Sequence, residues 1–498
     1  MSIKPIKYLL VLCSASFLLV YIFVAVKHIF YPYELEWMEG GMVDHVSRLL
    51  SGKQLYTEPS IEFTPFIYTP LFYYLGMIFS KILGTGFLSL RCISLFASFG
   101  SFIIIFKFVR KETQSLICAF ASIGLFAATY RIGGAWLDLA RVDSLFLLFL
   151  LWGVYLLRFH ESTLSLITSG ILIFLSFFTK QSAIVVGISM SVYSFIYLYQ
   201  WKKLLFPATV LLCLTMSTLV MNWVSQGWYS YYVFDLPLQH KMLPYQIIVF
   251  WIRDMKDVSI ALVISVCYCF ILLRRPKRKT NGYYIIFLVG MIGTSWLSRI
   301  HSGSYNNDLL PAYVALAIFF GLAIQAIISG SVITRFLRQK NALPQDMRAI
   351  NIVVFIACLA QFHVLVYNPF DVLPSREDLK AGDAFVNRVK EIKGEVFIPC
   401  HGYLSSLAGK KSHAHWMAIG DVLRGNDELK KTKLCLQLVE AVSCKQFGAI
   451  ILDNDISEIE NELALNYRLT PSVFNSRKVF WPITGAQTRP ELFYEISN

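Results

Sequence analysis

Residues 8–41 read YLLVLCSASFLLVYIFVAVKHIFYPYELEWMEGG, an apolar run that is followed at once by a glutamate-rich segment. The apolar part, residues 8–29, is long enough to cross the hydrocarbon core of a bilayer as a helix. Three glutamates, Glu34, Glu36 and Glu39, then precede a Gly-Gly pair. A carboxylate beside a hydrocarbon layer costs free energy unless it has a partner or a role. The pattern therefore indicates a site at the membrane surface.

The composition of the whole chain is typical of a membrane protein. Of its 498 residues, 56% are hydrophobic and only 15% are charged, whereas a soluble domain carries roughly a quarter charged residues. Repeated apolar runs separated by short basic loops predict a polytopic, all-α membrane protein. The net charge of +13 comes mainly from Lys and Arg in these loops, where they set topology. We therefore expect membrane lipids as partners and no nucleic acid.

The basic loops also predict which side of the membrane each loop faces, because cytoplasmic loops carry an excess of Lys and Arg. Lys4 and Lys7 place the N-terminus in the cytoplasm. The apolar segment 70–83 is short for a span, and keeping it at the outer surface brings every strongly basic loop to the cytoplasmic side. About eleven spans follow, at 8–29, 92–108, 115–130, 144–157, 164–178, 183–200, 204–222, 258–273, 283–298, 311–328 and 350–366. The chain is then expected in a bacterial inner membrane, with its C-terminus in the periplasm.

Two domains are predicted, a membrane domain at 1–369 and a soluble extracytoplasmic domain at 370–498. The second domain is expected to be small and α/β, with strands at 395–399 and 448–452 and helices at 377–391 and 433–446. Its histidines His401, His413 and His415 lack a Cys or carboxylate at metal-ligand spacing, so they are predicted to lie at the surface.

Ionisable side chains gather in the loops that this topology places outside. The acidic ones are Glu34, Glu36, Glu39, Asp138, Asp143 and Asp308. The basic ones are Arg91, Arg131, Arg141, Lys180, Arg299 and His301. A partly buried carboxylate has a raised pKa and suits a general base. Fixed cations, or a metal held by carboxylates, stabilise a departing phosphate, so both halves of a transfer reaction are available on one side.

Each candidate also has a simpler structural explanation. Glu34 and Glu36 are solvated interfacial residues in that alternative. Asp143 opens a span, where it would cap the helix beside its positive dipole end. Lys180 would be an ordinary snorkelling residue if it faced the cytoplasm, but its outer position runs against the positive-inside bias and favours a phosphate contact.

Five short segments follow one another between residues 1 and 330. They read ELEWMEGG at 34–41, YTPLFYYL at 68–75, ARVDSL at 140–145, FTKQSA at 178–183 and SGSYNNDLLP at 302–311. In this order and spacing they resemble the GT-C fold integral-membrane glycosyltransferases, in particular the bacterial group related to protein O-mannosyltransferases and to the aminoarabinose transferase of lipid A. The resemblance implies a GT-C fold and a transferase that uses a polyprenyl-phosphate-linked sugar on the outer face of the membrane.

The resemblance also implies roles for individual residues. The catalytic base falls on Glu34, or on Glu36 because the adjacent Asp-Glu pair of many relatives is missing here. Asp143 matches a second acidic residue of the family. Donor and phosphate contacts are expected from Arg141, Lys180, Arg299, Tyr68 and Asn307. Some relatives use a metal and others do not, so the cofactor stays open; a divalent cation, Mg or Mn, would be held by Glu34 and Asp143.

The expected reaction is an inverting glycosyl transfer. The base removes a proton from an acceptor hydroxyl, which then attacks the anomeric carbon of the lipid-phosphate sugar; the acceptor is a glycan, a lipid or a protein. The alternative function is a transporter or flippase of lipid-linked saccharides, which would need ionisable groups or broken helices near mid-membrane. A third alternative is an inactive scaffold whose outer domain binds a partner.

Overall fold

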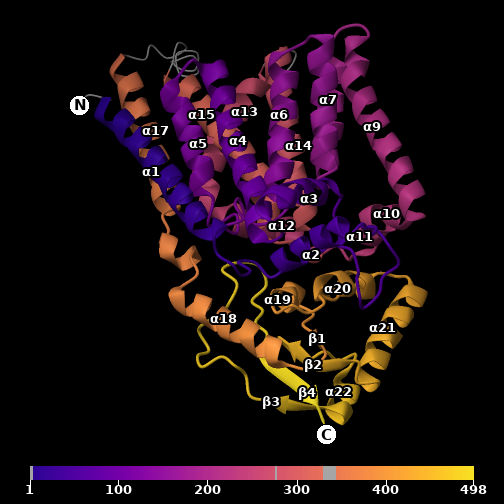
Figure 1. The fold of residues 1–498 in the computed structure, drawn as a ribbon. Coiled ribbons are helices and arrows are strands. Elements are labelled where there is room, and N and C mark those ends of the chain that lie inside the picture. Colours follow the sequence, from indigo (N-terminus) through magenta and orange to yellow (C-terminus); the bar gives the residue numbers. More distant parts are fainter. Residues whose placement is uncertain (1–3, 275–277, 329–343, 498) are drawn as a thin grey trace.

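The computed structural model describes residues 4–274, 278–328 and 344–497. Long helices run side by side in a bundle, and a small sheet with its own helices covers one end of that bundle (Figure 1). We call this end, lower in Figure 1, the capped end, and residues 370–498 the C-terminal region.

A helix lies at each of the eleven predicted spans. These helices are α1 (Lys4–Ile29), α4 (Phe87–Thr113), α5 (Leu116–Ala128), α6 (Asp143–Phe159), α7 (Thr163–Phe177), α8 (Ala183–Tyr197), α9 (Lys202–Ser225), α13 (Ser259–Leu273), α14 (Lys279–Arg299), α15 (Leu310–Ile328) and α17 (Pro344–Val364). Among the described residues, five helices are long and apolar enough to cross a membrane, or up to six if one bent pair is counted as a single span. The structure therefore supports an integral membrane protein, and the count of eleven crossings stays a prediction.

Small residues let the central helices of the bundle approach closely. A side chain at Gly124 of α5 would collide with Ser14 of α1, and one at Gly321 of α15 would collide with Ser122 of α5. Close backbone approach of this kind replaces the hydrophobic driving force that is missing between helices in lipid. α15 is accordingly buried along most of its length.

The predicted surface segment 70–83 forms α3 (Leu71–Leu83), which lies at the capped end beside α2 (Glu39–Leu50). Its first backbone N–H, at Leu71, donates to the carbonyl of Phe178 at 2.9 Å. Just after its last residue, the carbonyl of Thr85 accepts from the hydroxyl of Tyr403 in the C-terminal region at 3.4 Å. Both ends of α3 therefore lie at the capped end, and the helix does not pass through the bundle.

The basic loops meet at the opposite end of the bundle. Lys111 contacts His160 at 3.5 Å, and Lys202 donates to the carbonyl of Glu161 at 3.1 Å. Lys279 pairs with the carboxylate of the same Glu161 at 2.6 Å. Basic loops that come together on one side are what the positive-inside bias predicts, and the assignment of that side to the cytoplasm remains a prediction.

The C-terminal region contains a four-stranded sheet and five helices. Strand order is β1-β2-β4-β3, with β1 parallel to β2 and the other neighbours antiparallel. The strands are β1 (Glu395–Phe397), β2 (Phe447–Leu452), β3 (Tyr467–Thr470) and β4 (Leu492–Ile496). The helices are α18 (Arg376–Glu391), α19 (Gly402–Leu407), α20 (Trp416–Arg424), α21 (Glu428–Ser443) and α22 (Glu460–Asn466). Both predicted strands and both predicted helices are confirmed.

The C-terminal region packs directly on the capped end. Met42 of α2 and Phe66 share one buried apolar cluster with Ala418 and Ile419 of α20. α2 lies between α3, where its Val46 packs on Gly76, and α19 of the C-terminal region. Short helices between α9 and α13 complete this end: α10 (Trp228–Ser230), α11 (Leu236–Gln239) and α12 (Gln246–Val249).

Candidate functional site

A cavity of about 1030 Å³ lies at the capped end, between the bundle and the C-terminal region. Five of the predicted site residues line it: Glu36, Tyr68, Arg141, Lys180 and Asn307. Four further lining residues come from the C-terminal region: Met417, Arg424, Gly485 and Ala486. Loops from distant parts of the chain therefore meet around one space, as the five sequence segments suggested.

Glu36 and Arg141 form a buried ion pair on the cavity wall. The Arg141 Nη1 atom lies 2.8 Å from Glu36 Oε2, and its Nη2 donates to the Tyr68 hydroxyl at 2.8 Å. The third guanidinium nitrogen, Nε, is buried and has no hydrogen-bond partner among the residues that the structure describes. Burial raises the pKa of the Glu36 carboxyl to about 7, although Arg141 acts in the opposite direction. A carboxylate with this pKa accepts and releases a proton near neutral pH.

Lys180 is held in the cavity by two carboxylates. Its Nζ lies 2.7 Å from Asp143 Oδ1 and 2.8 Å from Asp308 Oδ1. Burial alone would lower the pKa of Lys180, but the two carboxylates outweigh burial and raise the pKa above its usual range. Lys180 therefore remains a cation at every physiological pH, and it comes from the loop between α7 and α8.

Asp143 lies behind Lys180 and does not line the cavity. Its carboxylate also accepts from Asn307 Nδ2 at 2.9 Å and from Trp136 Nε1 at 2.8 Å. It is the first residue of α6, where its charge faces the positive end of the helix dipole. The N-cap is Val142, without a side-chain cap bond, so Asp143 is not the helix cap that the structural alternative assumed.

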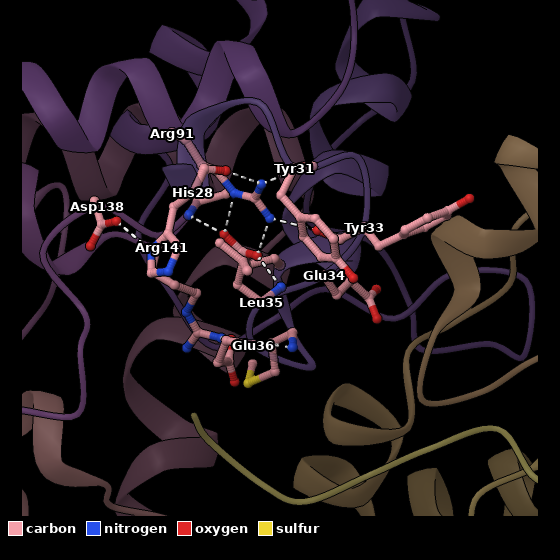
Figure 2. A network of polar contacts seen from close by, with 12 residues as sticks. His28, Tyr31, Tyr33, Glu34, Leu35, Glu36, Arg91, Asp138 and Arg141 are labelled. Carbon is pink, nitrogen blue, oxygen red and sulfur yellow. Dashed lines mark hydrogen bonds and ion pairs between the residues drawn. The ribbon is translucent and has the colours of Figure 1, made fainter. Parts of the chain in front are cut away.

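Glu34 points away from Glu36 (Figure 2) and does not line the cavity. Its Oε2 contacts Nδ1 of His401 in the C-terminal region, and Nε2 of the same ring lies 2.9 Å from Asp453. Burial raises the pKa of Glu34. Burial alone would lower the pKa of His401, but the two carboxylates raise it to about 10. His401 is therefore a buried cation between two carboxylates.

The prediction of surface histidines is wrong for all three of these residues. His401, His413 and His415 are buried, with exposed fractions of 3%, 6% and 4%. For His401 and His415 the expectation failed because their partners are distant in the chain: His401 contacts Glu34, and His415 Nε2 lies 3.1 Å from the carbonyl of Trp37. The sequence signal for buried histidines was the presence of three of them within residues 401–415.

Arg91, which is labelled in Figure 2, pairs with the buried Glu39 and fixes the loop that carries these glutamates. Arg91 Nη2 lies 2.6 Å from Glu39 Oε2, and both side chains are fully buried. Arg91 also donates to the backbone carbonyls of His28, Tyr31 and Tyr33 at 2.6–2.9 Å. This pair is a structural clamp at the end of α1, which the sequence analysis did not distinguish from the site.

Arg299 is not brought to the cavity. Its Nε lies 2.7 Å from Asp254 Oδ2, and its Nη1 donates to the carbonyl of Ser304 at 3.2 Å. Arg299 thus ties the end of α14 to the following loop. Its cation, which was expected to contact a phosphate, is paired with the carboxylate of Asp254.

The two suggested metal ligands do not lie together. Glu34 is engaged by His401, whereas Asp143 is engaged by Lys180, Asn307 and Trp136. Among the residues that the structure describes, no group of three or more His, Cys, Asp or Glu is arranged to hold a metal ion. Glu34 and Asp143 therefore do not fit a shared divalent cation.

No protein-family model and no curated protein sequence matches the chain. Solved structures do match it, over nearly its whole length. ArnT from Cupriavidus metallidurans bound to undecaprenyl phosphate superposes with a TM-score of 0.60 at 11% identity, covering 97% of each chain. The chain has the GT-C fold.

Two other structures share this fold with the chain. The apo form of the same ArnT gives a TM-score of 0.61 at 10% identity, covering 96% of this chain and 98% of ArnT. The archaeal oligosaccharyltransferase AglB from Archaeoglobus fulgidus, in complex with an inhibitory peptide and a dolichol-phosphate, gives 0.52 at 10% identity, with 88% of this chain and 69% of AglB covered. These glycosyltransferases confirm the GT-C fold that the five sequence segments predicted, and the activity of this chain is argued from its own site.

Proposed function

We propose that the chain is a membrane glycosyltransferase that moves a sugar from a polyprenyl-phosphate-linked donor to an acceptor hydroxyl on the periplasmic face of a bacterial inner membrane. The observation that carries the proposal is the cavity itself. It combines the Glu36 carboxylate, with its near-neutral pKa, the cations Arg141 and Lys180, and an apolar flank in one space at the capped end.

The apolar flank supports a lipid donor. Val185 of α8 and Leu214 and Leu219 of α9 line the cavity on this side. Leu219 is also 60% exposed, so the cavity reaches the outer surface of the bundle, where membrane lipid would lie. A polyprenyl chain would leave the cavity along this flank at no cost in exposed apolar area. ArnT, with the same fold, was crystallised with undecaprenyl phosphate.

Arg141 and Lys180 support a phosphate between the flank and the glutamate. Both are cations on the cavity wall, and one buried N–H group of Arg141 finds no partner within the described part of the chain. Fixed cations stabilise the charge that develops on a departing phosphate, and do so more strongly in a site of low dielectric. Asp143 and Asp308 hold the ammonium of Lys180 in place.

Glu36 is the base in this proposal, because it lines the cavity and Glu34 does not. Glu36 takes the proton of the acceptor hydroxyl while the acceptor oxygen forms a bond to the anomeric carbon. The bond from that carbon to the phosphate oxygen breaks, and its electron pair leaves with the polyprenyl phosphate. Attack opposite to the leaving phosphate inverts the configuration at the anomeric carbon.

A proteoliposome assay with a radiolabelled polyprenyl-phosphate sugar tests the proposal. Glu36→Gln should lower transfer by roughly 10²-fold or more, the usual contribution of a general base, without loss of folded protein. Glu58→Gln serves as the matched control, because Glu58 lies in the same outer loop and is more than half exposed. Full transfer by Glu36→Gln would contradict the assignment of the base. Movement of the intact donor across the bilayer, without transfer, would instead identify a flippase.

A further inference from the structure

The C-terminal region contacts five consecutive residues of the loop that carries Glu36. These residues, 33–37, are called the carboxylate segment below. The Tyr33 hydroxyl donates to Asp383 at 2.6 Å, and Glu34 pairs with His401. The carbonyl of Leu35 accepts from the backbone N–H of Ile483 at 2.9 Å.

The remaining two residues of the carboxylate segment are held in the same way. Glu36 forms a parallel bridge with Thr484, and the carbonyl of Trp37 lies 3.1 Å from His415 Nε2. A hydrogen-bonded backbone flanked by a buried ion pair has little freedom to shift. The C-terminal region therefore determines where this backbone lies.

Through Gly485, the C-terminal region also contacts the side chain of Glu36. A Cβ at Gly485 would lie 2.8 Å from Cγ and 2.9 Å from Oε1 of Glu36. The opposite carboxylate oxygen, Oε2, is bound by Arg141. The carboxylate is thus confined between a guanidinium of the bundle and a glycine backbone of the C-terminal region.

We propose that the C-terminal region is part of the catalytic apparatus, since its residues 483–485 and His401 position the Glu36 carboxylate from the side opposite the bundle. Gly485 is the positioning residue in contact with Glu36, and His401 acts one step further away, through Glu34. The inference rests on the proposed function, in which Glu36 is the base. A displacement of about 1 Å at a reacting group costs on the order of 10²-fold in rate, so loss of this contact should lower kcat.

The test compares Gly485→Ala with Gly409→Ala in the full-length protein in proteoliposomes. Both glycines have left-handed backbones, with φ of 80° and 75°, but a Cβ at Gly409 would meet no atom within 4 Å. The two variants therefore share the backbone strain and differ in the contact with Glu36. Gly485→Ala should lower kcat by roughly ten-fold or more, with little change in the KM for the lipid donor. It should also move the acid limb of the kcat–pH profile to higher pH, because a weaker contact with Arg141 raises the pKa of the Glu36 carboxyl.

Two outcomes would overturn the inference while leaving the proposed function intact. Gly485→Ala could behave as Gly409→Ala does, or it could raise KM alone, as expected if Gly485 merely walls the cavity. Absence of transfer by the wild-type protein would overturn the proposed function, and the catalytic part of the inference with it.

Hydrogen exchange of the peptide that spans residues 33–39 tests the contact without any activity. His401→Ala should speed exchange in this peptide, whereas His413→Ala should not. His413 is also a buried histidine facing a carboxylate, but its partner, Glu395, lies within the C-terminal region. Equal exchange in both variants would contradict the inference.

Discussion

Arg91→Met is expected to destabilise the protein severely, because it leaves the charge of Glu39 buried without a cation. Both members of this pair are fully buried, and removing one partner of such a pair costs about 3–5 kcal/mol. The carbonyls of His28, Tyr31 and Tyr33 lose their donor at the same time. We therefore expect a loss of at least about 3 kcal/mol, a large part of the stability of a typical folded domain.

Replacing both partners should be less harmful than the sum of the single changes. In Arg91→Met with Glu39→Gln no uncompensated charge is left, so the coupling between the two changes should reach about 1–3 kcal/mol. The matched control is Lys433→Met. Lys433 pairs with Glu58 at 2.7 Å, but both are more than half exposed, and such surface pairs contribute about 0–1 kcal/mol.

Unfolding by a denaturing detergent, followed by tryptophan fluorescence in lipid-containing micelles, measures these differences. The reasoning is refuted if Arg91→Met unfolds at the same detergent fraction as Lys433→Met. It is also refuted if the double variant is no more stable than additivity predicts.

Three further predictions concern the site. The wild-type transfer rate should fall by about ten-fold per pH unit as the pH decreases below about 7, because Glu36, with its raised pKa, is then increasingly protonated. A rate that stays flat down to pH 5 would exclude Glu36 as base. Lys180→Met should weaken inhibition by undecaprenyl phosphate by about ten-fold or more, measured as the inhibition constant, while Lys433→Met leaves it unchanged. The raised pKa of His401 contributes stability that is fully present below pH 6.5 and is lost as pH rises through about 10. The thermal unfolding temperature of His401→Ala should therefore lack the part of the decrease at alkaline pH that His401 causes in the wild-type protein.

The helices and the positions of the site loops were predictable, because both follow from short stretches of sequence. Hydrophobic runs define the helices of the bundle, and motifs at loop ends placed Tyr68, Lys180 and Asn307 at one cavity. Apolar runs also located β1 and β2, since buried strands carry their own pattern.

The pairing of charges was not predictable in the same way. Glu34 binds a histidine 367 positions away, and Arg299 is taken by Asp254, 45 positions away. Local pattern carries no information about such partners, because they are set by how the C-terminal region docks on the bundle for Glu34, and by how the loops at the ends of the bundle helices meet for Arg299. The choice between Glu34 and Glu36 as base therefore required the fold.

The order of the contacts along the chain has a consequence for biosynthesis. Glu36 leaves the ribosome early, but its neighbours Thr484 and Gly485 are added only after the bundle and most of the sheet. A nascent chain that already contains α17 thus still lacks one wall of its cavity. Under the proposed function, a chain interrupted before residue 484 would carry Glu36 without these two contacts.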